Sequence, residues 1–365
     1  MQSGMERAVT LTFKKERLLP LDLLRGLAAS VVAVGHANVF SNLDYSLCVV
    51  FFYILSGYVL AYAYGEAIGS DRMTAYDFAV IRIARLYPLH ILTAAFVAVM
   101  WSVSVVLVHH GLSNLSKPTA TGVLETITLT QSLFTGGWSL NTPSWSIAAE
   151  LWCGLIMLPL CSSSRMLRAV AVLVCVLAYL ATAMNGGFIG SMTWRYGTAL
   201  GCFAVGWGLH FLRIDRGGWI GWAIAVFAFT SMMFSPISAD GRPLLEFGYV
   251  VAFALVVLLL ADAKMPEWTS GLASLSGDLS YGIYLWHWPL LCAVGTLPLP
   301  KPIKAIIFAP LLVGVCLLSF KYFEVPARRS VRALMLRRVK WSSGKATASL
   351  VIETAEKDLA AGPVA

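Results

Sequence analysis

Charged side chains are scarce in this sequence of 365 residues. Asp, Glu, Lys and Arg make up 13% of it, whereas 58% of its residues are hydrophobic. A soluble globular domain carries about 25% charged residues, so this composition argues against a soluble enzyme. It predicts a polytopic membrane protein of the all-α class, because a backbone in lipid must satisfy its own hydrogen bonds.

Motifs of several other chemical classes are missing. The seven cysteines are scattered, mostly within apolar runs, and they form neither a Cys-x-x-Cys pattern nor a Cys/His cluster. We therefore expect no metal and no disulfide framework. The net charge of +8 is spread between apolar runs rather than gathered in one patch. This distribution is typical of membrane topology and not of nucleic-acid binding, so no nucleic-acid partner is expected.

Long apolar runs dominate what is present. About ten segments can be drawn at about twenty residues each, which is enough for a helix to cross a bilayer. They cover residues 19–40, 47–64, 88–108, 145–161, 168–185, 194–212, 217–235, 244–261, 281–297 and 303–322. The sequence thus predicts a bundle of about ten transmembrane helices.

Basic residues set the predicted orientation of this bundle. With the N-terminus inside, the inner loops up to residue 264 hold Arg72, Arg82, Arg85, Arg165, Arg168, Arg213, Arg216 and Lys264. The outer loops hold Lys117, Arg195, Arg242, Lys301 and Lys304. Since Lys and Arg are enriched on the cytoplasmic side, both termini are predicted to be cytoplasmic.

The predicted organisation is one membrane domain with two tails. Residues 1–18 form a cytoplasmic tail, residues 19–326 the membrane domain, and residues 327–365 a tail that is first basic and then disordered. The apolar stretch 124–134 in the longest outer loop is expected either to dip into the membrane surface or to pack as a loop.

The first apolar run carries Arg25 near its inner end and His36 toward its outer end. They are eleven positions apart, so on a helix they share one face and lie about 16 Å apart along the axis. Ionisable residues in such a run usually face a protein interior or a water-filled cavity. His36 can accept a proton from an alcohol, or it can be a structural histidine bonded between helices.

Three further charged residues are candidates for chemistry. Arg82 and Arg85 share a helical face at the inner entrance of the third predicted span, where two guanidinium groups can bind phosphates or simply set topology. Glu150 lies one or two turns into the fourth span, at a depth comparable to that of His36. It can orient an imidazole, or it can form a structural ion pair.

Polar residues on two other segments are open to a binding or a packing role. Ser56 and Gly57 interrupt the bulky run FFYILSGYVL, where helix packing is the simpler explanation and no Gly-x-Ser-x-Gly elbow supports a serine nucleophile. Tyr281, Tyr284 and His287 share a helical face, which can line a cavity or form a hydrogen-bonded aromatic seam.

Taken together, these stretches resemble the integral-membrane acyltransferase 3 family, which acylates sugars of surface polysaccharides and related glycans. The matching features, in order, are Arg25 and His36 with ten residues between them, FFYILSGY at 51–58, Arg82-x-x-Arg85 before Pro88, Trp145-Ser146 with Glu150, Tyr284-Leu285 before His287-x-Pro289, and FEVP at 323–326. The second motif ends in Tyr58 where Phe is common in the family.

The resemblance implies the two substrates and the donor site. The acyl donor is acyl-coenzyme A, commonly acetyl-CoA, which acts as a co-substrate from the cytoplasm and is not a permanently bound cofactor. Its phosphates are expected to meet Arg25, Arg82 and Arg85. The acceptor is a carbohydrate or glycolipid hydroxyl.

The resemblance also implies the catalytic and acceptor-binding residues. His36 is expected to deprotonate the hydroxyl or to carry the acyl group, and Glu150 is its expected partner. The candidate acceptor-binding residues are Ser56, Trp145, Ser146, Tyr281, Tyr284 and His287.

A rival hypothesis is a transporter or flippase for an acylated or anionic metabolite, with intramembrane Arg and His lining its path. Many transporters show inverted repeats, and no internal symmetry is found here, which favours the enzyme. Under either hypothesis the chain is expected in a lipid bilayer, the bacterial inner membrane. The sequence predicts no particular oligomeric state.

Overall fold

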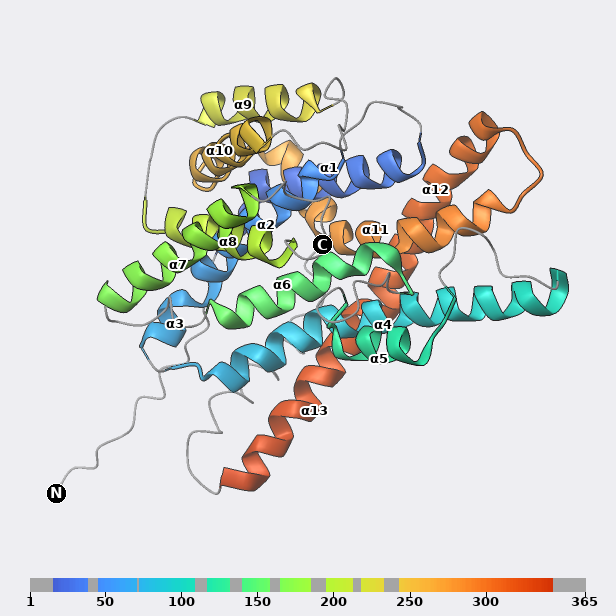
Figure 1. The fold of residues 1–365 in the computed structure, drawn as a ribbon, viewed down its shortest axis with the longest axis horizontal. Coiled ribbons are helices and arrows are strands. Elements are labelled where there is room, and N and C mark those ends of the chain that lie inside the picture. Colours follow the sequence, from blue (N-terminus) through green and yellow to red (C-terminus); the bar gives the residue numbers. More distant parts are fainter. Residues whose placement is uncertain are drawn as a thin grey trace.

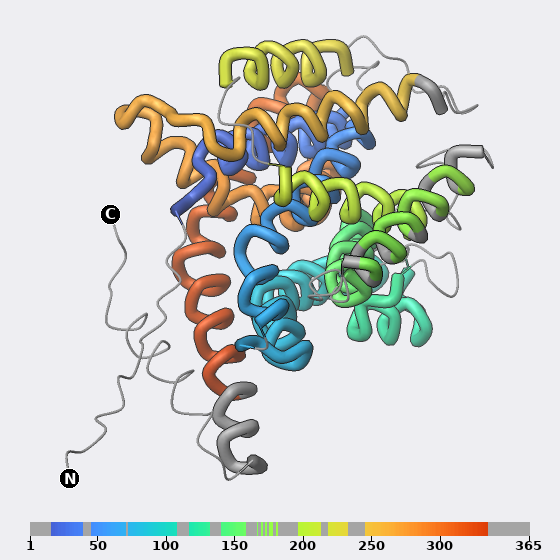
Figure 2. Tube along the Cα trace, turned by 90° about the vertical axis from the view of Figure 1, so that its left-hand side faces the viewer, coloured from blue at the N-terminus to red at the C-terminus, as the bar shows by residue number. Residues whose placement is uncertain are grey.

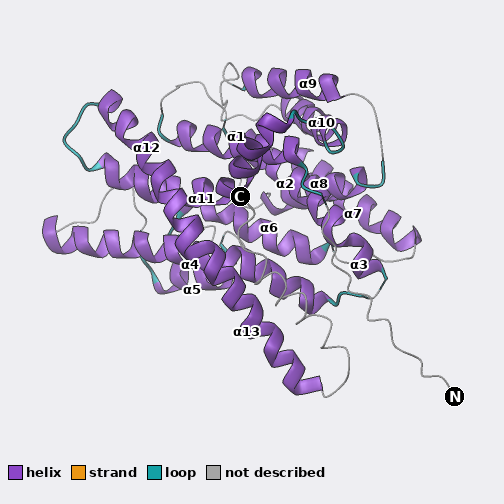
Figure 3. Cartoon of the chain, turned by 180° about the vertical axis from the view of Figure 1, so that it is seen from behind, coloured by secondary structure: helices purple, strands orange, loops and turns teal. Residues whose placement is uncertain are grey.

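The structure, a computed structural model, describes residues 16–38, 45–70, 72–108, 117–131, 140–157, 165–184, 195–212, 218–232 and 243–343. Within these residues every regular element is a helix and no strand is present (Figure 3). The prediction of an all-α protein is therefore confirmed for this part of the chain.

The helices are numbered in chain order (Figure 1). The first half contains α1 (Leu19–His36), α2 (Leu47–Leu60), α3 (Glu66–Gly69), α4 (Ala75–Val108), α5 (Ala120–Thr128), α6 (Trp145–Ile156) and α7 (Arg165–Met184). The second half contains α8 (Arg195–Leu209), α9 (Gly218–Ser231), α10 (Pro243–Leu260), α11 (Glu267–Gly295), α12 (Lys301–Ser319) and α13 (Val325–Ser343). Two π-helical turns, η1 (Ala61–Gly65) and η5 (Phe320–Glu324), join α2 to α3 and α12 to α13 without a break.

Four helical stretches of the described chain are long and apolar enough to cross a membrane. They are Leu19–His36, Leu47–Gly69, Ala75–Leu107 and Lys301–Leu334. Two shorter apolar helices, Gly218–Ser231 and Leu245–Leu260, accompany them. Large aliphatic side chains such as Val106 and Ile306 face outward, 73% and 72% exposed, as expected of a surface covered by lipid. The number of ten crossings and the orientation of the termini stay predictions.

Helix α4 begins earlier than predicted. The prediction started this span at Pro88, but the helix starts at Ala75 and includes the proline. A reciprocal cap explains the start: the backbone N–H of Thr74 donates to the Asp77 carboxylate at 3.1 Å, and the N–H of Asp77 donates to the Thr74 hydroxyl at 3.1 Å. Arg82 and Arg85 therefore lie within the helix rather than at its entrance.

Two other segments extend or refine the predictions. Helix α13 continues from η5 to Ser343, so the predicted boundary at residue 326 falls inside a continuous helix, and residues 344–365 lie outside the described residues. In the outer stretch, Leu129 is fully buried and its carbonyl accepts a hydrogen bond from the Trp152 indole at 2.7 Å. Residues 124–128 of this stretch belong to the mostly exposed helix α5, residues 129–131 form a packed turn, and residues 132–134 lie outside the described residues.

The core is built from two closely packed helix pairs. Helix α1 lies along α11, and α2 crosses α8 (Figures 1 and 2). Gly57 and Gly206 lie at the second crossing, where a Cβ on either residue would collide with the backbone of the facing helix. The packing role predicted for Gly57 is confirmed, since only small residues allow this approach.

Candidate active site

One face of α1 carries both of its candidate residues and lies against α11. The Arg25 guanidinium donates from Nε to the Ser280 hydroxyl at 3.0 Å and from Nη2 to the Gly277 carbonyl at 2.8 Å. Three turns further along, the ring centroids of His36 and His287 are 5.0 Å apart. The prediction that Arg25 and His36 share a face is confirmed, and that face is turned toward α11.

Alternating charges fix Arg25 at the start of α1. Its Nη2 lies 3.0 Å from Asp22 Oδ1, and Asp22 Oδ2 lies 3.0 Å from Arg17 Nε. Arg17 in turn pairs with Asp278 of α11 at 3.0 Å. Partial burial lowers the pKa of Arg17, but the two carboxylates raise it by more, so it lies above its usual value. The network ties α1 to α11 and holds the Arg25 side chain in place.

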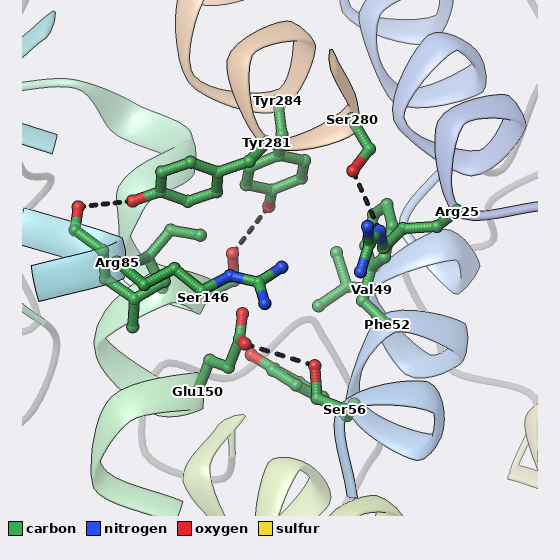
Figure 4. Close-up of a pocket in the computed structure, with 13 residues that line it drawn as sticks. Arg25, Val49, Phe52, Ser56, Arg85, Ser146, Glu150, Ser280, Tyr281 and Tyr284 are labelled. Carbon is green, nitrogen blue, oxygen red and sulfur yellow. Dashed lines mark hydrogen bonds between the residues drawn. The ribbon is translucent and has the colours of Figure 1, made fainter. Parts of the chain in front are cut away.

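A pocket of about 70 Å³ lies beside Arg25, between α1, α2, α4, α6 and α11 (Figure 4). Hydroxyl and charged groups share its wall with aliphatic and aromatic side chains. The lining residues are Arg25, Val49, Phe52, Tyr53, Ser56, Arg85, Leu86, Ser146, Ile147, Glu150, Ser280, Tyr281 and Tyr284. Of the eleven predicted site residues, seven converge on this one pocket.

Arg85 extends from α4 into the pocket, on the side opposite Arg25 (Figure 4). No residue of the described chain forms a hydrogen bond or an ion pair with its guanidinium, whereas Arg25 is held by three partners. A guanidinium group that faces a pocket without a carboxylate partner is suited to bind an anion with two parallel hydrogen bonds.

Arg82 has a different environment, although it lies only one turn before Arg85. It is buried, with 3% of its surface exposed, and its Nη2 lies 2.5 Å from Glu150 Oε1. The Ser56 hydroxyl donates to the same carboxylate oxygen at 3.2 Å. The two arginines expected to act together are therefore separated in role: one neutralises a carboxylate, and the other faces the pocket.

Glu150 contacts other partners than the one expected. The sequence suggested that it orients His36, but its carboxylate is bonded to Arg82 and Ser56 at the wall of the pocket. Position along a helix predicts depth, and it does not predict which neighbour the side chain meets. Helix α6 packs against α2, α4 and α8, so Glu150 is directed toward the arginine of α4.

The tyrosines of α11 both line the pocket and bond to neighbouring helices. The hydroxyls of Tyr284 and Ser146 lie 2.7 Å apart, and the Tyr281 hydroxyl donates to the Leu86 carbonyl at 2.6 Å. The two tyrosines therefore line a cavity and also form a hydrogen-bonded seam, so both interpretations of this face are correct for them. Trp145 is partly buried against the core and does not line the pocket.

His36 is half-buried at the last residue of α1. Its Nδ1 lies 3.1 Å from the Val32 carbonyl oxygen, and its ring contacts those of Tyr45, His287 and Trp288 at centroid distances of 4.4, 5.0 and 5.5 Å. Since a carbonyl only accepts, the neutral imidazole carries its hydrogen on Nδ1 and a lone pair on Nε2. That lone pair is what a general base uses.

Tyr284 connects the pocket to the two histidines. It lines the pocket, and its ring centroid lies 5.9 Å from that of His287, which in turn contacts His36. His36 and His287 themselves do not line the pocket. The pocket and the two imidazoles thus lie one after the other along the α1–α11 interface.

Several lining residues are not among those predicted from the sequence, for example Phe52, Tyr53 and Ser280. Phe52 and Tyr53 precede Ser56 by four and three residues, so helical spacing from Ser56 would have identified them. The Tyr53 hydroxyl is buried, and no residue of the described chain gives it a hydrogen-bond partner. It is available to a bound molecule.

Residues 19–321 match the family model of acyltransferase 3, which is described as an acyltransferase domain. The chain belongs to the acyltransferase 3 family. The match begins at the first residue of α1 and includes every residue of the pocket as well as His36 and His287. Together with the four long apolar helices, this membership identifies a membrane acyltransferase.

One relative of this acyltransferase 3 protein is "protein 2 in picA locus" of Rhizobium radiobacter. It is 35% identical over 154 residues, which are 37% of this chain and 78% of the relative. No solved structure matches the chain.

Proposed function

We propose that this acyltransferase 3 protein moves an acyl group, acetyl in the first instance, from cytoplasmic acyl-coenzyme A to a carbohydrate hydroxyl, with His36 as the base. One observation carries the proposal. The guanidinium groups of Arg25 and Arg85 flank a pocket, and a half-buried imidazole with a free Nε2 lies three turns further along the same helix.

The donor phosphates are assigned to Arg25 and Arg85. Two cations beside one pocket repel each other unless an anion lies between them, and the diphosphate of coenzyme A supplies that charge. Arg82 supports this site indirectly, because it neutralises Glu150, which would otherwise compete for Arg85. The pantetheine arm then passes the hydroxyls of Tyr281 and Tyr284 on its way to His36.

The reaction follows from the state of His36. Its Nε2 takes the proton of the acceptor hydroxyl while the oxygen attacks the thioester carbon. The carbon–sulfur bond breaks, and the coenzyme A thiolate takes from His36 the proton that came from the acceptor hydroxyl. Trp145, Ser146 and His287 are assigned to the acceptor side, which faces away from the cytoplasm, in the inner membrane of a bacterium.

The test is acyl-coenzyme A turnover by the purified protein in detergent, with free thiol measured in the presence and absence of a glycan acceptor. Glycan-dependent thiol release supports the enzyme. A transporter or flippase cannot act vectorially in detergent, so binding without thiol release would favour the rival hypothesis. Comparing the surface glycans of deletion and complemented strains by mass spectrometry then identifies the acceptor.

A further inference from the structure

His36 needs a partner other than Glu150. A general base becomes a cation when it takes a proton, and a partly buried cation requires a hydrogen-bond acceptor or a counter-charge. Glu150 is bonded to Arg82 and Ser56 instead. The Val32 carbonyl orients the Nδ1 side of His36 but leaves its Nε2 side without support.

The side chains around His36 limit which residue can be its partner. Among the helices that the structure describes, α2, α10 and α11 pack against α1. The titratable side chains in ring contact with His36 are Tyr45, just before α2, and His287 of α11. Helix α10 carries Glu246 and Tyr249, and no ring contact or ion pair joins either of them to His36 within the described chain.

His287 offers an unused acceptor. It is fully buried, and its Nδ1 lies 3.1 Å from the Ile283 carbonyl oxygen one turn earlier. Because that carbonyl only accepts, Nδ1 carries the hydrogen and Nε2 has the lone pair. This Nε2 is buried and has no hydrogen-bond partner within the described chain. Buried polar atoms without a partner are rare, and one that contacts a candidate base calls for an explanation.

The separation of the two rings suits a direct bond. Two imidazoles joined by one N–H···N hydrogen bond, with about 2.9 Å between the nitrogens, have centroids about 5 Å apart. The centroids of His36 and His287 are 5.0 Å apart and their planes are inclined by 37°. Within the described chain His287 Nε2 has no hydrogen-bond partner, so a bond between the two Nε2 atoms requires the His36 ring to turn.

We propose that His287 is a positioning residue for His36, and that its Nε2 accepts the N–H that His36 acquires when it takes the substrate proton. This inference rests on the proposed role of His36 as base. The hydroxyl proton passes to His36 Nε2, the ring turns so that this N–H donates to His287 Nε2, and the ring turns back to give the proton to the departing thiolate. His287 itself stays neutral throughout, because its only hydrogen remains on Nδ1.

Two substitutions distinguish the roles of the two ring nitrogens of His287. His287→Asn places an amide near the Nδ1 position and removes the Nε2 acceptor, whereas His287→Gln places an amide oxygen near the Nε2 position. His90→Asn is the matched control: His90 is equally buried, is bonded to a backbone carbonyl at 2.9 Å and has no ring contact with His36.

The experiment has two readouts. Histidine labelled with ¹⁵N reports the protonation midpoint of His36 by NMR in detergent, with its signal among the six histidines assigned by loss in His36→Asn. His287→Asn should lower that midpoint by about half a pH unit or more. In acyl transfer, kcat should fall about 10- to 100-fold with an unchanged KM for acyl-coenzyme A. His287→Gln should recover most of both changes, and His90→Asn should show neither.

The outcomes separate the inference from the function on which it rests. An unchanged His36 midpoint in His287→Asn overturns the inference whether or not the protein is active. Absence of acyl transfer in the wild type counts against the proposed function. The NMR midpoints still show whether His287 bonds to protonated His36. If His287→Asn does not fold, His287→Met fills the same volume without a nitrogen acceptor and takes its place.

Discussion

Arg82 of α4 and Glu150 of α6 form a partly buried ion pair, with Nη2 and Oε1 2.5 Å apart, at the edge of the pocket that Arg85 enters. The pair links two helices and compensates the charge of Glu150. Arg85, one turn further along α4, has no carboxylate partner within the described chain. This division of roles between two neighbouring arginines determines how each should respond to substitution.

Loss of Arg82 should mainly cost stability. Arg82→Ala leaves the partly buried Glu150 carboxylate without its counter-charge, which costs up to about 3–5 kcal/mol, the range for fully buried pairs. Thermal unfolding in detergent should show a clear drop. The double variant Arg82→Met/Glu150→Leu should be more stable than Arg82→Ala alone, because no charge is left unpaired. If both variants unfold together with the wild type, the pair does not stabilise the fold.

Loss of Arg85 should mainly cost donor affinity. Arg85→Ala removes a guanidinium that forms no hydrogen bond or ion pair within the described chain, so the unfolding temperature should change little while KM for acyl-coenzyme A rises about 10-fold or more. Arg85→Lys should recover only part of the affinity, since an ammonium group lacks the planar fork. Arg72→Ala, which removes an arginine exposed beside Glu66, is the control. Equal effects of the Arg72 and Arg85 substitutions on KM would refute the phosphate assignment.

The Tyr284 and Ser146 hydroxyls should act as one unit. Each bonds to the other at 2.7 Å, so Tyr284→Phe and Ser146→Ala remove the same interaction. Each single change should cost about 1 kcal/mol of stability, and the double change clearly less than the sum of the two. A double-mutant cycle from denaturation in detergent measures this coupling. Strict additivity would mean that the hydroxyls contribute independently.

Sidedness can be tested with single cysteines in a variant without native cysteines. A cysteine at position 85 should react with an impermeant thiol reagent only after the membrane is opened, and acyl-coenzyme A should protect it. A cysteine at position 38, two residues beyond His36, should react from outside. The opposite labelling pattern would invert the predicted topology and contradict entry of the donor from the cytoplasm.

Much of the site could be predicted because helical periodicity is a local property. Arg25 and His36 are eleven residues apart, and this alone places them on one face; the structure adds that the face meets α11. The spacing of Tyr281 and Tyr284 in the same way anticipated a shared wall, which lines the pocket.

The contacts between distant segments could not be predicted in this way. Whether Glu150 meets Arg82 or His36 depends on how α6 is rotated against α4, and no single-helix pattern records that rotation. The start of α4, by contrast, could have been predicted, because its capping residues Thr74 and Asp77 can be recognised in the sequence. The prediction starts the span at Pro88 instead, because the long apolar run begins there.

The role of His36 is tested by the transfer of labelled acetyl from acetyl-CoA to a glycan, with purified wild-type protein and with His36→Ala. With the wild type, label is expected in the glycan. With His36→Ala, turnover is expected to be lower by about 10²- to 10⁴-fold, in protein that unfolds at the wild-type temperature and binds acetyl-CoA as tightly. Near-normal transfer by a well-folded His36→Ala protein would contradict the assignment of His36 as the base.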